Sequence, residues 1–120
     1  YPNGVFYDQA ERALYLSEVR YVDHFLRLLN DKLHFDDPEV LLIVTADHGE
    51  EFGEHGGLGH ATTLYEEQVR VPLMVRWPAG LGAGARRREQ AVSLVDILPT
   101  VRALLGREPG AQGEPLPLAD

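Results

Sequence analysis

The stretch that most constrains the fold is residues 40–60, VLLIVTADHGEEFGEHGGLGH. Its first seven residues, 40–46, are apolar apart from Thr45. A short apolar run that contains β-branched residues and is bounded by turn residues is typical of a strand buried on both faces, as in parallel sheets. The stretch therefore predicts a strand over residues 40–46, followed by an acidic, glycine-rich loop.

Asp47 and His48 come directly after this predicted strand. In open α/β sheets, ligands bind just beyond the carboxyl ends of the strands. Carboxylate and imidazole are good ligands for divalent metals, and Gly49 allows the backbone to turn sharply behind them. The same three residues are equally typical of an ordinary turn, in which Asp47 caps a helix and Gly49 has a positive φ.

The acidic residues of the loop, Glu50, Glu51 and Glu54, are also open to two interpretations. They are typical of a solvated acidic loop as well as of a metal site. The loop lacks the alternating ligands of an EF-hand and the His-Glu-x-x-His pattern of a zinc protease. Its spacing alone therefore leaves both interpretations open.

The longest periodic segment precedes the strand and predicts a helix over residues 5–33. Its apolar positions alternate in steps of four and three, which predicts one stripe pressed onto a sheet. The stripe consists of Tyr15, Val19, Val22, Leu26, Leu29 and Leu33. Pro38 disfavours helix in the residue before it, so helix and strand form an αβ unit.

After the acidic loop, a Thr followed by Glu predicts a capped short helix near residues 63–68. Residues 69–77 predict a second strand, with Pro72 near its start because proline lacks an amide donor. Residues 78–84 are loop-like in composition, and residues 89–93 predict a short extended stretch. A last helix is expected over residues 97–105, capped by Ser93 or Asp96, with Pro99 in its first turn and Gly106 as its stop.

The composition restricts the function classes that fit the chain. With 120 residues and 44% hydrophobic content, it is at most one small domain. A net charge of −8 argues against nucleic acid or an anionic membrane as a partner. No cysteine is present, so disulfides, thiolate metal sites and a cysteine nucleophile are excluded from this segment. The longest apolar run is too short to cross a bilayer.

The first and last residues do not resemble the ends of a complete chain. Residues 1–4 are typical of a loop, and the final residues are rich in proline and glycine. We expect residues 1–120 to be a fragment of a single larger domain, with a core over residues 5–106 and a tail over residues 107–120.

Several motifs together resemble the C-terminal half of a sulfatase catalytic domain in the alkaline phosphatase superfamily. The motifs are TADHGE at 45–50, GEHG at 53–56, LYEE at 64–67, RVPLMVR at 70–76 and VDILPT at 95–100, together with the helix over 15–29. Each motif alone is weak, whereas their order and spacing are specific. The resemblance covers residues 15–106 and implies a partial α/β/α sandwich with a mostly parallel sheet and flanking helices.

The resemblance also implies roles for individual residues. Asp47 and His48 match the pair that completes a divalent metal site in this family. Calcium is the metal that the family favours, whereas an imidazole ligand is chemically better suited to zinc or manganese. His60 matches a position, more often Lys, that contacts the sulfate or phosphate group during catalysis. His55 has no secure counterpart, and we expect a structural role or a place at the rim of the site.

The nucleophile of the family is absent from this chain. Sulfatases carry it in a Cys/Ser-x-Pro-x-Arg motif, and neither Ser17 nor Ser93 has these neighbours. We therefore expect hydrolysis of a sulfate ester in the intact parent protein and no turnover by the fragment alone. Two alternatives stay open. One is a phosphodiesterase, phosphonate hydrolase or phosphoethanolamine transferase of the same superfamily, and the other is a truncated, non-catalytic copy.

Overall fold

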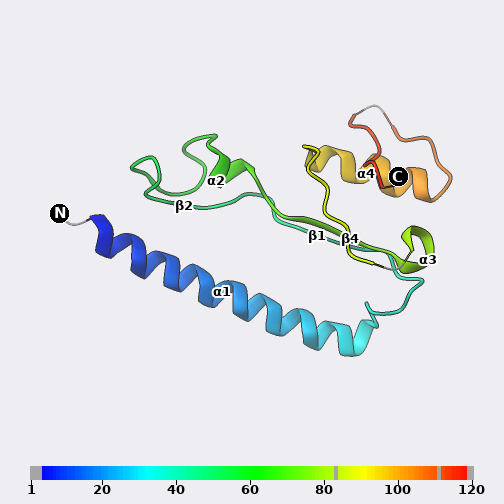
Figure 1. Cartoon of the computed structure of the whole chain (residues 1–120), viewed down its shortest axis with the longest axis horizontal. Helices are drawn as coiled ribbons and strands as arrows, with labels where there is room; N and C mark the ends of the chain where they lie inside the picture. The colour runs from blue at the N-terminus through cyan, green and yellow to red at the C-terminus, as the bar shows by residue number, and fades with distance from the viewer. Residues whose placement is uncertain (1–3, 83, 111, 119–120) are drawn as a thin grey trace. The chain divides into compact units, whose positions relative to one another are not determined.

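The computed structural model describes residues 4–82, 84–110 and 112–118, with side chains described from residue 9 onward (Figure 1). The chain divides into two compact units, Tyr1–Trp77 and Pro78–Asp120. Each unit is described by itself below. The assignment of all 120 residues to one domain remains a prediction.

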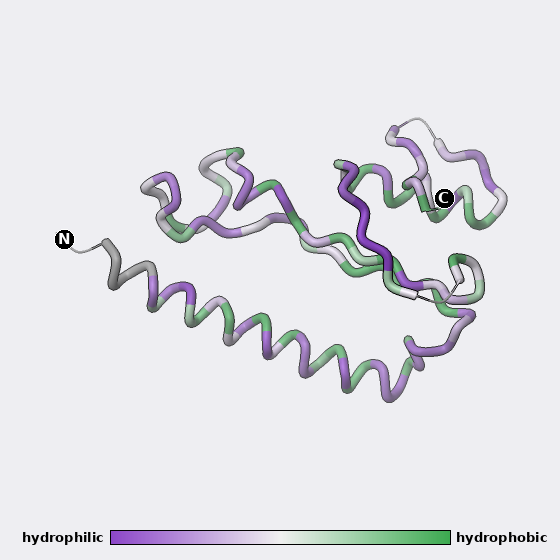
Figure 2. The backbone as a smooth tube through the Cα atoms, viewed as in Figure 1, coloured by the Kyte–Doolittle hydropathy of each residue, from purple (hydrophilic) through white to green (hydrophobic). Residues whose placement is uncertain are grey.

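The first unit begins with helix α1, Gly4–Leu33, which confirms the helix predicted from the apolar stripe. The stripe itself is not pressed onto a sheet as expected, since its members expose between 38% and 57% of their surface. Figure 2 shows hydrophobic positions recurring along the coloured part of the helix. The N-terminal half of α1 contacts the acidic loop of the same unit. The rings of Tyr15 in α1 and Phe52 in the loop meet edge to face, with their centroids 5.2 Å apart. No described element covers the rest of the stripe.

Strands β1, Leu42–Thr45, and β4, Leu73–Arg76, confirm the two predicted strands in shorter form. Pro72 lies directly before β4, as its missing amide requires. The α/β fold class is confirmed, but this pair is antiparallel, with Leu42 opposite Arg76 and Thr45 opposite Leu73. Parallel strands need a crossover that returns the chain to the starting end. Here the residues between the two strands stay at the carboxyl end of β1, where the Gly49 amide donates a hydrogen bond to the Gln68 carbonyl. Strand β4 therefore starts at that end and runs in the direction opposite to β1. The expected burial of β1 on both faces is also wrong, because Leu42, Ile43 and Val44 are half-buried and Thr45 is exposed.

The predicted irregular loop contains a small antiparallel hairpin. Strand β2, Glu51–Phe52, pairs with strand β3, Leu58–Gly59, and Glu51 lies opposite Gly59. Helix α2, Glu66–Val69, confirms a short helix in this region. Its expected threonine cap is wrong, because Tyr65 occupies the N-cap and makes no side-chain capping bond. The Thr63 hydroxyl instead accepts a hydrogen bond from Gln68 Nε2.

The connection between α1 and β1 is held by Arg76 of β4. Its guanidinium donates hydrogen bonds to three successive backbone carbonyls, those of Phe35, Asp36 and Asp37. Asn30 accepts a bond from the Asp36 amide at the helix end. These charge-assisted bonds from one guanidinium fix the turn that reverses the chain.

The second unit contains helix α3, Pro78–Leu81, the 3-10 turn η1, Leu94–Asp96, and helix α4, Ile97–Leu104. The prediction of an irregular loop over residues 78–84 is wrong for α3, and residues 89–93 form no strand. Ser93 occupies the N-cap of η1 and forms a capping box with Asp96. Asp96 occupies the N-cap position of α4 but makes no side-chain capping bond to that helix. Gly106 ends α4 with a φ of 66°, as expected for a glycine stop.

The tail beyond α4 forms neither helix nor strand among its described residues, yet it packs against the helix. Leu116 is buried, and its amide donates a hydrogen bond to the Thr100 hydroxyl. The Glu114 amide donates a second bond to the Asp96 carboxylate. The second unit is therefore held together by polar side chains at the start of α4. Within the part of the chain that the structure describes, no helix has the length and apolar character needed to cross a membrane.

Candidate functional site

The structure brings the three residues predicted for the site together beyond the carboxyl end of β1. Asp47 and His48 follow β1, and His60 follows β3. Glu51 lies opposite Gly59 in the hairpin, so the neighbouring residues Glu50 and His60 come to lie opposite each other. The His60 Nδ1 lies 3.1 Å from a Glu50 carboxylate oxygen. The rings of His48 and His60 are stacked, with centroids 3.9 Å apart and planes inclined by 23°.

The backbone carbonyl of the next residue, Gly49, orients the His48 ring. Its Nδ1 lies 2.9 Å from the Gly49 carbonyl oxygen, an acceptor, so this nitrogen carries the proton in the hydrogen bond. In the neutral ring with this tautomer, Nε2 has the lone pair that binds a metal. The Nε2 is 3.8 Å from Asp47 Oδ1, and the Asp47 side chain is 90% exposed. Two ligands that each lie about 2.4 Å from one cation are separated by roughly 3.4 to 4 Å, so this pair fits a shared metal ion.

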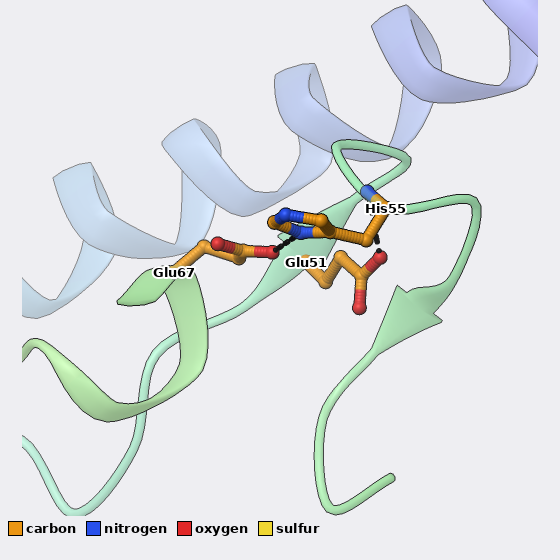
Figure 3. Close-up of side chains that lie close together, drawn as sticks. All are labelled: Glu51, His55 and Glu67. Atoms are coloured by element: carbon orange, nitrogen blue, oxygen red, sulfur yellow. Dashed lines mark hydrogen bonds and ion pairs between the residues drawn. The ribbon is translucent and has the colours of Figure 1, made fainter. Parts of the chain in front are cut away.

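A second cluster lies beside this pair and was not predicted as a site. Glu51, His55 and Glu67 place one potential ligand atom each within 4.8 Å of the others (Figure 3). The His55 Nδ1 is 2.5 Å from Glu67 Oε1, and the His55 ring stacks on Tyr65 at 3.7 Å. These contacts agree with the structural role expected for His55.

Glu51 is 99% buried, since only 1% of its surface is exposed, and this overturns the solvated-loop interpretation for this residue. Its Oε1 accepts hydrogen bonds from the amides of His55, at 3.1 Å, and Gly57, at 2.9 Å. Its Oε2 accepts one from Gln68 Nε2, at 3.1 Å. Three donors thus compensate the burial of this carboxylate, as buried charge requires.

Positions 49 and 57 require glycine because other atoms lie too close for a Cβ atom. A Cβ at Gly49 would lie 2.0 Å from the Glu67 carbonyl oxygen, and one at Gly57 would lie 2.9 Å from Glu51 Oε2. Gly49 does not have the positive φ that the ordinary-turn interpretation predicted. Its glycine identity is needed because helix α2 packs directly on its backbone.

Glu54, the third acidic residue of the loop, lies at the hairpin turn and contacts α1. Its carboxylate accepts a hydrogen bond from the Phe52 amide and pairs with Arg12 at 3.0 Å. The Phe52 amide, then the residue's own amide, then the Arg12 guanidinium hold the pKa of Glu54 below its ordinary value of 4.5. The Arg12 guanidinium also lies 5.5 Å from the centre of the Phe52 ring. Arg12 and Tyr15 together fix α1 against the hairpin.

A cavity of about 670 Å³ opens between α1 and the hairpin, next to His60. Helix α1 contributes Glu11, Tyr15 and Glu18 to its walls, and the loop contributes Glu50, Phe52 and His60. His60 therefore borders a hollow that is large enough for part of a small organic molecule.

The sequence did not predict the hairpin or the roles of Glu51 and Gln68. The glycines at positions 53, 56, 57 and 59 around Phe52 and Leu58 carried a hairpin signal, since such turns need positive φ. Gly53, Gly56 and Gly59 do have positive φ values. No local pattern marks Glu51 as buried, because its partner Gln68 lies 17 residues away.

Comparison with known proteins identifies the family. The Sulfatase family model matches residues 1–107. An uncharacterized sulfatase, YidJ, of Escherichia coli is 33% identical over 82 residues, which cover 68% of this chain and 16% of that protein. The multifunctional alkaline phosphatase superfamily protein PehA of Trinickia caryophylli is 32% identical over 115 residues, covering 88% of this chain and 22% of that protein. The mouse steryl-sulfatase is 40% identical over 82 residues, covering 58% of this chain and 13% of that protein.

The chain thus spans between 13% and 22% of the length of these relatives. No solved structure matches it. The family match extends over β1, the hairpin, α2, β4 and α4. It therefore includes all the residues that form the site described above. The chain belongs to the sulfatase family.

Proposed function

We propose that the intact protein hydrolyses sulfuric esters and that Asp47, His48 and His60 form part of its active site. The observation that carries this proposal is the convergence of the three side chains at the carboxyl end of β1, with the two imidazoles stacked 3.9 Å apart. Membership of the sulfatase family supports the reaction class.

Asp47 and His48 would hold a divalent cation, which would supply Lewis-acid stabilisation of charge on sulfate oxygens. The 3.8 Å separation of His48 Nε2 and Asp47 Oδ1 supports this assignment, as does the Nδ1 hydrogen bond that leaves Nε2 free to coordinate. Calcium prefers oxygen ligands such as the Asp47 carboxylate, whereas the His48 imidazole is a better ligand for zinc or manganese. We propose calcium, following the family, with zinc or manganese as the alternative.

His60 would bind the sulfate group beside the metal. Its Nδ1 donates to Glu50, so the ring is held in one orientation and its Nε2 is available to the substrate. Because Nδ1 already donates to Glu50, Nε2 can donate to the sulfate group only in the imidazolium form of the ring. This cation would stabilise charge that develops on a sulfate oxygen during transfer. The cavity next to His60 would receive the alcohol portion of the ester.

The attacking nucleophile and the remaining metal ligands would come from outside these 120 residues. Among the described residues, no third carboxylate, histidine or cysteine places a ligand atom within 4.8 Å of those of both Asp47 and His48. We therefore propose that the fragment alone does not turn over substrate.

The test uses the intact protein with 4-nitrophenyl sulfate. His60→Ala should lower kcat by about 10²- to 10³-fold, the usual effect of removing one donor that stabilises transition-state charge. Asp23→Ala removes an exposed carboxylate that pairs with Arg27 on α1 and is the matched control, with activity unchanged. Equal activity of His60→Ala and wild type would show that His60 has no role in the reaction.

A second candidate is hydrolysis of a phosphate diester or phosphonate ester. The similarity to PehA over 88% of this chain favours keeping this candidate. Bis(4-nitrophenyl) phosphate releases the same nitrophenolate, so the two substrates compare the transferred group directly. A higher kcat/KM for the phosphate diester would assign the protein to phosphoryl transfer, and no activity on either ester would favour a non-catalytic copy.

A further inference from the structure

We infer that Glu51 is a positioning residue, whose buried carboxylate clamps the hairpin to helix α2 and so fixes His48 and His60 relative to each other. The inference rests on the proposed function, because it assigns a role toward the same active site. It concerns a residue that touches neither the proposed metal ligands nor the proposed sulfate contact.

The first step is the set of donors that Glu51 accepts from. Two are backbone amides of the hairpin turn, those of His55 and Gly57, and the third is the side-chain amide of Gln68 in α2. The carboxylate therefore joins a turn that has little apolar packing to a helix of four residues. Hydrogen bonds to a buried carboxylate are stronger than neutral ones and strongly directional.

The second step is the connection from α2 to the end of β1. Gln68, which is 4% exposed, uses its side chain for Glu51 and its backbone carbonyl for the Gly49 amide, at 2.7 Å. Gly49 is adjacent to His48 in the chain. Glu51 is adjacent to Glu50, whose carboxylate binds His60. Each histidine is thus one chain step and one hydrogen bond from the same Glu51–Gln68 pair.

The third step concerns how little else holds the hairpin. Strands β2 and β3 contain two residues each, and Phe52, Leu58 and His60 are all partly or largely exposed. Two-stranded hairpins of this size are marginally stable without further packing. Other contacts also join the hairpin to α1, through Tyr15 and Arg12, and to α2, through the bond between His55 and Glu67. Glu51 is the buried side chain that connects the hairpin to Gln68 and, through the Gln68 carbonyl, to the Gly49 amide beside His48.

The same contacts argue against a cation between Glu51, His55 and Glu67 (Figure 3). Both oxygens of Glu51 already accept hydrogen bonds, and His55 Nδ1 is bonded directly to Glu67. The cluster is closed by its own donors and acceptors, which is the arrangement expected of a structural network.

The test reverses the direction of one hydrogen bond. Gln68→Glu places a carboxylate against the Glu51 carboxylate and removes its donor. The double change Glu51→Gln with Gln68→Glu restores a donor–acceptor pair, since the new amide donates to the new carboxylate while its oxygen still accepts from the two turn amides. Glu54→Gln is the matched control, because it neutralises a hairpin carboxylate that lies outside the clamp.

In the intact protein, Gln68→Glu should lower kcat for 4-nitrophenyl sulfate about 10- to 100-fold, because a displacement of about 1 Å costs this much. KM should change less than about threefold, since the cavity walls on α1 are untouched. The double variant should recover kcat to within about fivefold of wild type, and Glu54→Gln should retain it. A double variant no better than Gln68→Glu, or Gln68→Glu equal to wild type, would overturn the inference.

Hydrogen–deuterium exchange measured by mass spectrometry separates this inference from the proposed function. Exchange in the peptide that spans residues 49–60 should rise in Gln68→Glu and return toward wild type in the double variant. This rise and recovery are expected whichever ester the protein hydrolyses. Wild-type protein inactive on sulfate esters but with this exchange pattern would contradict the proposed function alone, whereas unchanged exchange would contradict the clamp.

Discussion

The contact between Gly49 and helix α2 yields the most quantitative prediction. A methyl group introduced by Gly49→Ala would lie 2.0 Å from the Glu67 carbonyl oxygen, whereas ordinary van der Waals contact begins at 3.4 Å. The backbone of residue 49 and α2 must therefore separate by more than 1 Å. The hydrogen bond from the Gly49 amide to the Gln68 carbonyl is 2.7 Å long and cannot survive this separation.

The cost has two parts. Losing one backbone hydrogen bond costs about 1 kcal/mol net, and forcing an extra methyl into a filled space costs about 1–3 kcal/mol. Gly49→Ala should therefore lower the free energy of unfolding of the intact protein by about 2–4 kcal/mol. It should also reduce sulfate ester hydrolysis, because the same shift moves His48.

The measurement is denaturant unfolding followed by circular dichroism, together with kcat for the same variants. The control is Gly53→Ala, since Gly53 has a φ of 103° and no atom within 4 Å of the added Cβ. Its cost comes from the positive φ alone, about 1–3 kcal/mol, and it leaves His48 in place. If Gly49→Ala proves no more destabilising than Gly53→Ala and just as active, the close approach of α2 does not constrain the site.

Three further predictions concern contacts away from the histidines. The folded-state pKa of Glu54 is held below 4.5, so its carboxylate contributes stability that is complete above about pH 4.5 and is lost as the pH falls through the folded pKa. Glu54→Gln should therefore lower stability at neutral pH but not in strong acid. Acid-unfolding curves of wild type and Glu54→Gln would reveal this difference, and parallel curves would refute it. Thr100→Val leaves the buried Leu116 amide without an acceptor, so it should lower the free energy of unfolding in denaturant by about 1–3 kcal/mol. Thr100→Ser keeps the hydroxyl and should lower it by less than about 1 kcal/mol. Equal losses of stability in the two variants would refute the role of the hydroxyl. Arg76→Lys cannot bond three carbonyls at once, so it should speed deuterium exchange in residues 34–41, and unchanged exchange would contradict the account of that turn.

The sequence predicted those parts of the fold that depend on local pattern. The alternation of apolar residues in steps of four and three predicted α1, and the apolar run before Asp47 predicted β1. Pro72 and Gly106 marked the start of β4 and the end of α4, because proline lacks an amide donor and glycine tolerates positive φ. The order of the motifs brought Asp47, His48 and His60 into one hypothesis, although their roles remain predictions.

The remaining features depend on contacts between distant residues. Glu51 follows Glu50 in an acidic run, and the donors at His55, Gly57 and Gln68 make its burial possible. The antiparallel pairing of β1 with β4 follows from where α2 returns the chain, which the two apolar runs do not encode. The packing of Leu116 against α4 depends on one hydroxyl, that of Thr100, in a tail whose composition is typical of a loop.

The most direct test of the proposed active site is a calorimetric titration of the intact protein with calcium. The account predicts that Asp47→Ala weakens calcium binding at least about 100-fold, since it removes a charged ligand, while the exposed control Asp23→Ala binds as wild type does. Wild-type calcium affinity in Asp47→Ala would contradict the assignment of Asp47 and His48 as metal ligands at the end of β1.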